Sequence, residues 1–314
     1  MLRIRYGVLL LMISFIVCSV KAQDSDYAYQ LALERIEEAR QTHAESVYLP
    51  DELIELPPEL FTLTDLKVLD LSYINIVSIP PDIGQMTSLR ELRICCVGLQ
   101  FLPPEIGNLI NLEDLALHSN SLASLPDEIS NLKNLKMLQL SGNGFMTLPA
   151  SIGELTSLEE LWLDYNQLTT LPPEIGQLKN LAILNLGGNK LTALPLELEY
   201  LPNLCWMDTN SNQLQELPPV ITQVKSLIKG EGCTSRNGGY IYEGMQVWGN
   251  PLPYPEDVIN GDTRTLFAYL DNQAAYHIQR ILLVGGGVSG LIVLVSAGMI
   301  WRMRRHGEKK KKRG

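Results

Sequence analysis

The sequence has few residues of the kinds that build catalytic or metal centres. Its 314 residues include only five cysteines and four histidines. The histidines are spread along the whole chain, and no grouping of Ser, His and Asp or of Cys and His suggests a nucleophile with its base. A glycine pattern of the dinucleotide-binding type, at residues 285–290, lies inside an apolar run instead of between a strand and a helix. We therefore predict no catalytic residues, no metal site and no cofactor: the protein is not an enzyme.

Basic residues are scarce between residues 23 and 301. This part of the chain has 14 Lys and Arg but 34 Asp and Glu, so its formal charge is −20. The whole-chain charge of −10 hides this imbalance, because eight basic residues gather at 302–314. An acidic surface repels phosphate, so nucleic acid is a poor candidate partner. A basic protein, or one bridged by a divalent cation, is favoured. The alternative is that the charge serves solubility alone.

What the sequence does contain is a repeat with a period of 23 residues. The unit is L-P-x-x-I-G-x-L-x-x-L-x-x-L-x-L-x-x-N-x-L, and it is almost intact at 171–191. The prolines that keep this step are Pro57, Pro80, Pro103, Pro126, Pro149, Pro172, Pro195 and Pro218, and the leucines are Leu66, Leu89, Leu112, Leu135, Leu158, Leu181, Leu204 and Leu227. The sequence therefore predicts a solenoid of tandem coils.

This unit resembles the leucine-rich repeat family. The resemblance implies an α/β fold, a curved horseshoe with a parallel sheet on its concave face, to which the sequence adds one transmembrane helix. Each L-x-L core gives a short strand, and the I-G-x-L segment returns as a short helix or 3₁₀ turn, with a glycine where that turn ends. Inward-facing asparagines are implied to satisfy turn backbone groups of their own and the next coil; they are Asn120, Asn143, Asn166, Asn189 and Asn212.

Both ends of the array are predicted to be capped, because an end coil lacks a neighbour. Residues 23–55 combine an amphipathic helix with a partial first repeat whose strand is one residue out of register. Regular repeats fill 56–227. Residues 228–270 form an irregular last repeat with a 15-residue insertion in its Gly-rich part and a C-terminal cap, which resembles the array end of bacterial Roco-type proteins.

The cysteines are limited in their pairing by the repeat geometry. Cys95 and Cys96 lie five coils from Cys205, roughly 24 Å at the strand spacing, which is too far for a disulfide. They are predicted to be free. Cys205 and Cys233 fall in adjacent coils, so a bridge between them is allowed and stays an open question. Secreted animal leucine-rich repeat proteins usually carry dense cysteine clusters at both ends, and their absence here, with that of any N-x-S/T sequon, favours a bacterial envelope protein.

Two apolar segments predict a single-pass membrane protein. Residues 1–22 fit a secretory signal peptide, with lipoprotein processing at Cys18 as the alternative. After a linker at 271–280, the segment Ile281–Trp301 has no charge and can span a bilayer as a helix. The basic tail, residues 302–314, then places the repeats outside the cytoplasm and the tail inside. Within the span, Gly286 and Gly290 permit close helix approach and weak dimerisation, with ordinary glycine usage as the alternative.

The strand register predicts which side chains face the concave side, namely those at the third, fifth and seventh positions of each unit. Two tryptophans on this predicted solvent face stand beside Asp164 and Asp208, a composition typical of a protein-interface hot spot. The alternative is that each Trp packs on its neighbours across the sheet. The predicted partner-binding residues are Trp162, Asp164, Trp206, Asp208, Met137, Gln139, His118 and Asn185.

These observations predict a cell-surface protein that binds another protein through its concave face, in a receptor-like or scaffold role. Two alternatives remain. The solenoid could serve as a structural or adhesive spacer in the envelope, or the chain could be an accessory subunit that recruits an enzyme complex through its span or tail. The identity of the ligand is not contained in the sequence.

Overall fold

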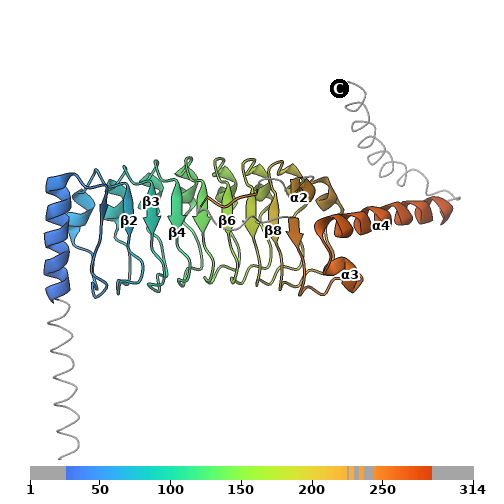
Figure 1. Cartoon of the computed structure of the whole chain (residues 1–314), viewed down its shortest axis with the longest axis horizontal. Helices are drawn as coiled ribbons and strands as arrows, with labels where there is room; N and C mark the ends of the chain where they lie inside the picture. Colours follow the sequence, from blue (N-terminus) through green and yellow to red (C-terminus); the bar gives the residue numbers. More distant parts are fainter. Residues whose placement is uncertain (1–25, 225, 230–232, 237–243, 285–314) are drawn as a thin grey trace, which may run out of the picture. The chain divides into compact units, whose positions relative to one another are not determined.

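The computed structural model describes residues 26–224, 226–229, 233–236 and 244–284. The chain divides into two units, one up to Tyr254 and one from Pro255. The first unit is a solenoid whose nine strands form a single parallel sheet in sequence order (Figure 1). The predicted parallel solenoid is therefore confirmed.

The sheet consists of β1 (Ser46–Val47), β2 (Val68–Asp70), β3 (Glu91–Arg93), β4 (Asp114–Ala116), β5 (Met137–Gln139), β6 (Glu160–Trp162), β7 (Ile183–Asn185), β8 (Trp206–Asp208) and β9 (Gly244–Gln246). The return segments are 3₁₀ turns: η1 (Pro58–Thr62), η2 (Pro81–Gln85), η3 (Pro104–Asn108), η4 (Asp127–Asn131), η5 (Ala150–Glu154), η6 (Pro173–Gln177), η7 (Leu196–Tyr200) and η8 (Pro219–Gln223). A helix at residues 26–42 precedes the sheet, and α2 (Ser226–Lys229) follows η8.

The strand register follows the sequence period. Within β2–β8 each residue pairs with the one 23 positions later, as Leu161 does with Leu184. Ser46 pairs with Val68, one residue short of the period, which confirms the shifted first strand. Trp206 pairs with Gly244, 38 positions later, so the last coil holds 15 additional residues. The insertion therefore has the predicted length and lies between β8 and β9.

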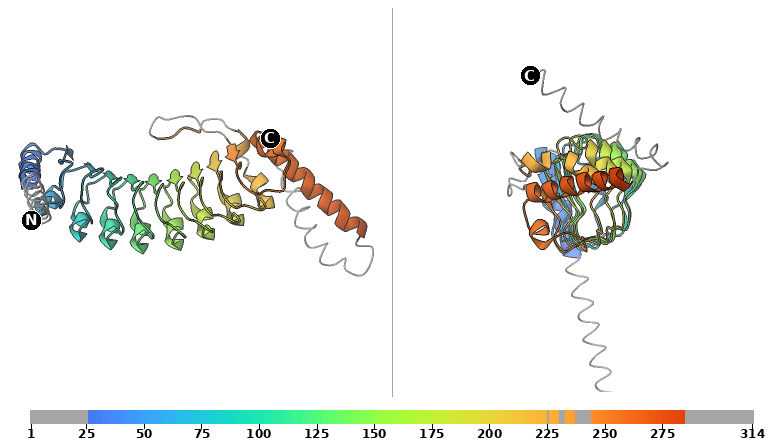
Figure 2. Two further views of the ribbon diagram at one scale, coloured as in Figure 1. Left: turned by 90° about the horizontal axis from the view of Figure 1, so that it is seen from below. Right: turned by 90° about the vertical axis from the view of Figure 1, so that its right-hand side faces the viewer.

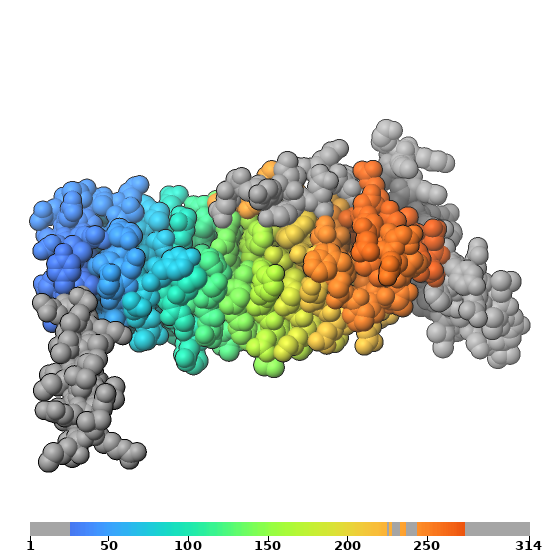
Figure 3. Space-filling view, turned by 60° about the horizontal axis from the view of Figure 1, so that its bottom comes forward, coloured from blue at the N-terminus to red at the C-terminus, as the bar shows by residue number. Residues whose placement is uncertain are grey.

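The solenoid curves with its strands on the inner side and its 3₁₀ turns on the outer side (Figure 2). The strand leucines Leu92, Leu115, Leu138, Leu161 and Leu184 point inward and are buried, together with one isoleucine from each turn of η2–η6. The coils pack side by side in a continuous band (Figure 3). Strands can approach to about 4.8 Å, and the bulkier turns need more room, so the array bends toward its sheet.

The inward asparagines bridge neighbouring coils as the resemblance implied. The side chain of Asn189 donates to the carbonyl oxygens of Leu163 (2.9 Å) and Leu186 (3.0 Å) and accepts from the backbone N–H of Leu168 (3.0 Å). Asn120, Asn143, Asn166 and Asn212 make equivalent bonds, and Asn250 continues the ladder behind the insertion. The coils from β3 to β9 are thus tied to one another by inward asparagines, of which Asn166, Asn189 and Asn212 are buried.

A second asparagine ladder on the outer side was not anticipated from the sequence. Asn134 donates from Nδ2 to the carbonyl oxygen of Ile110 at 2.8 Å, and Asn180 does the same to Thr156 at 2.8 Å. Asn111 and Asn203 occupy the same place in their coils. These side chains are exposed, so each bond competes with water and contributes less than a bond of the inner ladder.

The glycines of the 3₁₀ turns are needed for close packing and do not adopt a left-handed turn ending. A Cβ on Gly107 would lie 2.4 Å from the carbonyl oxygen of Glu128 in the next coil, and one on Gly153 would lie 2.6 Å from that of Glu174. Neither glycine has a positive φ. A left-handed residue instead recurs shortly after each strand of β2–β9, at Tyr73, Cys96, Ser119, Gly142, Tyr165, Gly188, Ser211 and Gly249.

The N-terminal helix at residues 26–42 buries Ala28, Ala32, Ile36 and Ala39 on one face, which is the pattern of the predicted amphipathic helix. The second unit contains α3 (Glu256–Ile259) and α4 (Thr263–Val284). Asp262 accepts a hydrogen bond from the backbone N–H of Thr265 at 2.8 Å, which satisfies a free donor of the first turn of α4. α4 is continuous through residues 271–280, where the sequence analysis places a linker.

The predicted membrane segments fall largely beyond the described part of the chain. The signal peptide at 1–22, the tail at 302–314 and the span from residue 285 onward, with Gly286 and Gly290, lie outside the described residues. In the part that is described, the helices are too short or too polar to cross a bilayer. The membrane topology stays a prediction from the sequence.

Candidate functional site

The concave face carries three parallel rows of side chains, one for each outward-facing position of the coil. The first row includes Met137, Glu160, Ile183 and Trp206, which occupy equivalent positions in β5–β8. The second row includes Gln139, Trp162, Asn185 and Asp208. The third includes His118, Asp164 and Asn210, which follow two residues after their strands. The structure therefore places all predicted partner-binding residues on one face, as the register required.

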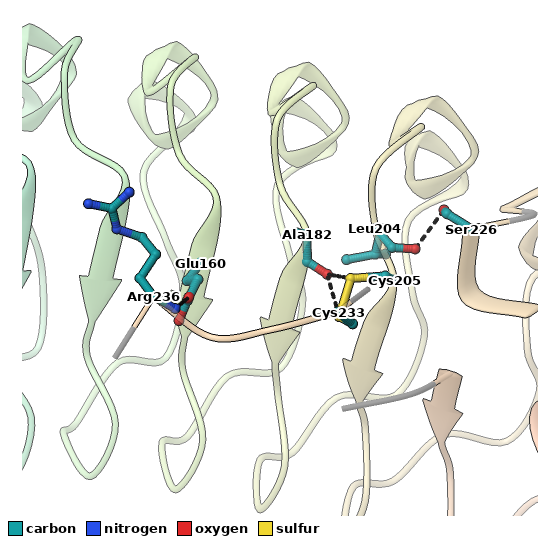
Figure 4. Close-up of a disulfide and its surroundings, with 7 residues drawn as sticks. All are labelled: Glu160, Ala182, Leu204, Cys205, Ser226, Cys233 and Arg236. Carbon is teal, nitrogen blue, oxygen red and sulfur yellow. Dashed lines mark hydrogen bonds between the residues drawn. A yellow bond between two sulfur atoms is a disulfide. The ribbon is translucent and has the colours of Figure 1, made fainter. Parts of the chain in front are cut away.

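Part of the insertion crosses the first row as a strap, which we define as residues 233–236. A disulfide joins Cys233 to Cys205, with the two Cα atoms 5.7 Å apart, and settles the pairing that the sequence left open. From there the strap passes to β6, as Figure 4 shows. The backbone N–H of Arg236 donates to Oε1 of Glu160 at 2.5 Å, and the hydroxyl of Ser235 donates to Oε2 at 3.0 Å. Cys95 and Cys96 are free, as predicted.

The guanidinium of Arg236 lies within a group of carboxylates at the same edge of the sheet. Its nitrogen atoms are 3.4 Å from Glu159, 3.5 Å from Asp114 and 3.8 Å from Glu113. Burial acts to lower the pKa of Arg236, but Asp114 and Glu159 outweigh it and raise that pKa. The pKa of Glu113 is lowered, chiefly by its hydrogen bond from Lys136. The acidic face thus holds a basic side chain of its own chain.

Three of the predicted contact residues are buried. Trp206 is 6% exposed, Met137 is 3% exposed and Asn185 is 9% exposed. Cys233 packs on Trp206 and Ile183, and the ring of Trp162 packs against that of Trp206 with 5.9 Å between centroids. Arg236 bonds to β6 through its backbone and to β4 through its side chain, so it crosses β5 where Met137 lies. The prediction that Trp206 and Met137 form an open surface is wrong, because both side chains are buried and Cys233 of the strap packs on Trp206.

Several side chains of the second and third rows remain partly exposed. His118, Gln139, Asp164 and Asp208 are half-buried, with one edge in solvent. Trp162 is also half-buried and donates from Nε1 to Glu160 at 3.0 Å, which ties it to the residue that holds the strap. Asn185 is 9% exposed and its Oδ1 accepts from the backbone N–H of Gly187.

Two exposed aromatic residues border these open rows and were not selected from the sequence. Tyr165, 74% exposed, sits at a left-handed position directly after Asp164. Trp248 is 53% exposed, and its carbonyl oxygen accepts from Ser211, which places it in the third row beyond Asn210. The signal that could have identified Tyr165 is its step of 92 residues, four periods, from Tyr73. Trp248 was not identified from the sequence, because the insertion interrupts the 23-residue spacing before it.

Asp208 is held in an environment that disfavours its charge. Burial raises its pKa, the nearby charge of Asp164 adds to this, and a hydrogen bond from the backbone N–H of Asn210 opposes it. When folding raises the pKa of a carboxyl group, the folded state loses stability as the pH rises from the ordinary pKa of the group through its raised pKa. Above the raised pKa the folded chain bears this cost at a half-open surface, and a cationic group placed beside Asp208 would relieve it.

A small hollow lies on the same face, on the N-terminal side of the strap. It encloses about 40 Å³ and is lined by residues of β3–β5, among them Arg93, Asp114, Ala116 and Gln139. The short side chain of Ala116 between two longer neighbours of its row leaves this space. A hollow of this size accommodates one small side-chain group and no organic cofactor.

Comparison with known proteins identifies the repeat. Residues 104–185 match the model described as "Leucine-rich repeat region", and residues 156–216 match "Leucine rich repeat". None of the curated proteins compared matches the chain.

Solved structures give the same result. A leucine-rich repeat protein of Leptospira interrogans is 35% identical, with a TM-score of 0.56, over 67% of this chain and 52% of that one. The ectodomain of the plant membrane receptor kinase GASSHO1/SCHENGEN3 of Arabidopsis thaliana, in complex with CASPARIAN STRIP INTEGRITY FACTOR 2, is 32% identical, with a TM-score of 0.52, over 64% of this chain and 24% of that one. The Toll–Spätzle complex of Drosophila, at 23% identity and a TM-score of 0.51 over 64% and 29%, shares the fold. The chain spans about half of the Leptospira protein and about a quarter of the plant ectodomain.

Proposed function

We propose that this chain, whose array is a leucine-rich repeat solenoid, is anchored in a membrane, presents the array outside the cytoplasm and binds another protein through its concave face. The repeat is of a type that supports protein–protein interaction, and two of the similar structures are complexes with protein partners. The signal-peptide pattern at 1–22 and the uncharged run at 281–301 support the anchoring.

The observation that carries the proposal is a strip of aromatic and acidic side chains beside the strap. We define this strip as Asp164, Tyr165, Asp208 and Trp248. Tyr165 and Trp248 offer apolar area at its border, and Asp164 and Asp208 offer charge between them. Interfaces are built in this way, with an aromatic anchor and neighbouring polar groups. The net charge of the surrounding surface favours a basic partner. The contact region is therefore moved from Trp206 and Met137 to the residues that the strap leaves open.

Tyr165 is the residue whose replacement tests this site most cleanly. Tyr165→Ala in the full-length chain is expected to reduce capture of a membrane partner at least about tenfold, since aromatic anchors commonly contribute 2 kcal/mol or more. The measurement is quantitative affinity capture from native membranes with a tagged chain.

Tyr73→Ala is the matched control, because Tyr73 has the same left-handed backbone conformation and is 68% exposed four coils away. It should leave capture unchanged. Equal capture by the wild type and both variants would place binding outside the strip, and equal loss in both would indicate a general effect of the substitution.

A further inference from the structure

The strap is an addition to the solenoid and not a part of its sheet. β8 pairs directly with β9 through Trp206 and Gly244, Met207 and Met245, and Asp208 and Gln246. Behind the insertion Asn250 makes the same bonds as the other ladder asparagines. The last coil therefore closes as its neighbours do, and the path of the strap across the concave face is not required by the fold.

The strap binds the face in the way that a peptide ligand would. Three residue steps from Cys233 to Arg236 cross from β8 to β6, roughly 10 Å at the strand spacing, so this segment is nearly extended. Glu160, only 1% exposed, accepts both the backbone N–H of Arg236 and the hydroxyl of Ser235. A main-chain donor and a side-chain donor thus meet one buried carboxylate.

The side chain of Arg236 reaches a site that is built for a guanidinium. Glu159, Asp114 and Glu113 surround it, and each provides an oxygen atom within 4 Å. A planar guanidinium with five N–H donors can form hydrogen bonds to several carboxylates at once, which an ammonium group cannot do in the same geometry. Glu113 is further held by Lys136 at 2.6 Å, which fixes the carboxylate in place.

Beneath the strap lies an apolar floor. Ile183 and Trp206 are buried against Cys233, with Trp162 at the edge of the cluster. Among the described strap residues, Cys233 packs on this floor, and Ser235 and Arg236 are held by polar contacts. A segment with few buried apolar contacts opens more easily than the core on which it lies. Without the strap, the floor and its acidic rim would form a groove with the composition of a protein-binding hot spot.

We propose that this groove is a binding site for an extended, arginine-bearing segment of a partner protein, and that the strap occupies it as an internal competitor. The inference deepens the proposed function and rests on it, because it gives the chemistry of a partner for the same face. A tethered occupant acts at an effective concentration in the millimolar range. A partner then binds with an affinity reduced by the fraction of chains in which the groove is open.

The test uses the strap itself as a probe in trans. An eight-residue peptide with the sequence of residues 231–238, with serine at position 233, is labelled and titrated against the purified full-length chain. The released variant, Cys233→Ser with Arg236→Ala, is expected to bind it at least about tenfold more tightly than the wild type, because the groove is then free. A peptide in which alanine replaces the arginine should bind the released variant at least about tenfold more weakly.

Three further variants complete the test. Arg236→Ala alone retains the disulfide and its stability, and should show intermediate peptide binding. Glu160→Gln in the released variant should abolish binding, whereas Glu128→Gln, an exposed glutamate on the outer side, should not. The inference is overturned if neither the released variant nor Arg236→Ala binds the peptide although both are folded. It is also overturned if the alanine peptide binds the released variant as tightly as the arginine peptide does. If partner capture still depends on Tyr165 in that case, the proposed function stands without it.

Discussion

Replacing Asn189 by alanine is expected to lower the free energy of unfolding by about 2–4 kcal/mol. The side chain is buried and makes three hydrogen bonds of 2.9 to 3.0 Å to the backbone of two coils. Its loss leaves the carbonyl oxygens of Leu163 and Leu186 and the N–H of Leu168 without these partners, and an unpaired buried group costs about 1–3 kcal/mol. Denaturant unfolding of the purified chain measures the change.

Asn134→Ala is the matched control for this prediction. Asn134 also donates from Nδ2 to a carbonyl oxygen of the preceding coil, but it is exposed, so water can replace the lost bond. Its replacement should cost less than about 1 kcal/mol. Equal losses in the two variants would contradict the view that burial gives the inner ladder its energetic weight.

Removing the disulfide with Cys205→Ser/Cys233→Ser is expected to cost about 3–4 kcal/mol, since the bridge closes a loop with a sequence separation of 28 residues. The strap should also leave the concave face more often, which exposes Trp206 and shifts its fluorescence toward longer wavelength. Unfolding monitored by circular dichroism and by tryptophan emission measures both effects.

Cys96→Ser is the control for this change. Cys96 is free and exposed, and serine occupies the equivalent left-handed position in two other coils, at Ser119 and Ser211. It should alter stability by less than about 0.5 kcal/mol. If removal of the disulfide costs no more than this control, or leaves the emission of Trp206 unchanged, the bridge does not hold the strap.

The array could be predicted in detail because one short rule is repeated along it. Each coil contacts only its neighbours, so the spacing of Pro and Leu residues fixes the register of β2–β8, and the inward face of each strand follows from alternation. The asparagine ladder followed from the same count, through the family resemblance. The length of the insertion and the shift of the first strand were also readable, because each appears as a deviation from 23 residues.

The surface could not be predicted with the same success, because the course of the strap depends on contacts far apart in the sequence. Arg236 and Glu160 are 76 positions apart, and no local pattern links them. For this reason Trp206 was placed in solvent although Cys233 of the strap packs on it, and Met137 was placed in solvent although it is buried. A possible bridge between Cys205 and Cys233 was noted, but its consequence for the concave face requires the position of residues 233–236.

The role of the turn glycines could not be derived from local rules. A glycine at the end of a turn suggests a left-handed residue, whereas Gly107 and Gly153 are small because the next coil lies against them. Contacts between coils, and not the conformation of one residue, select glycine there. The residues that do adopt the left-handed conformation include Tyr73 and Tyr165, which sequence reasoning would not assign to it.

The central claim, that the concave face binds a protein, can be tested with a photoreactive amino acid at two positions of one coil. His118 lies on the concave face, and Glu128 lies in η4 on the outer side of the same coil. In full-length chains irradiated in their native membranes, position 118 is predicted to form a crosslinked adduct with a partner protein and position 128 is not. An adduct from position 128 with none from position 118 would contradict the claim.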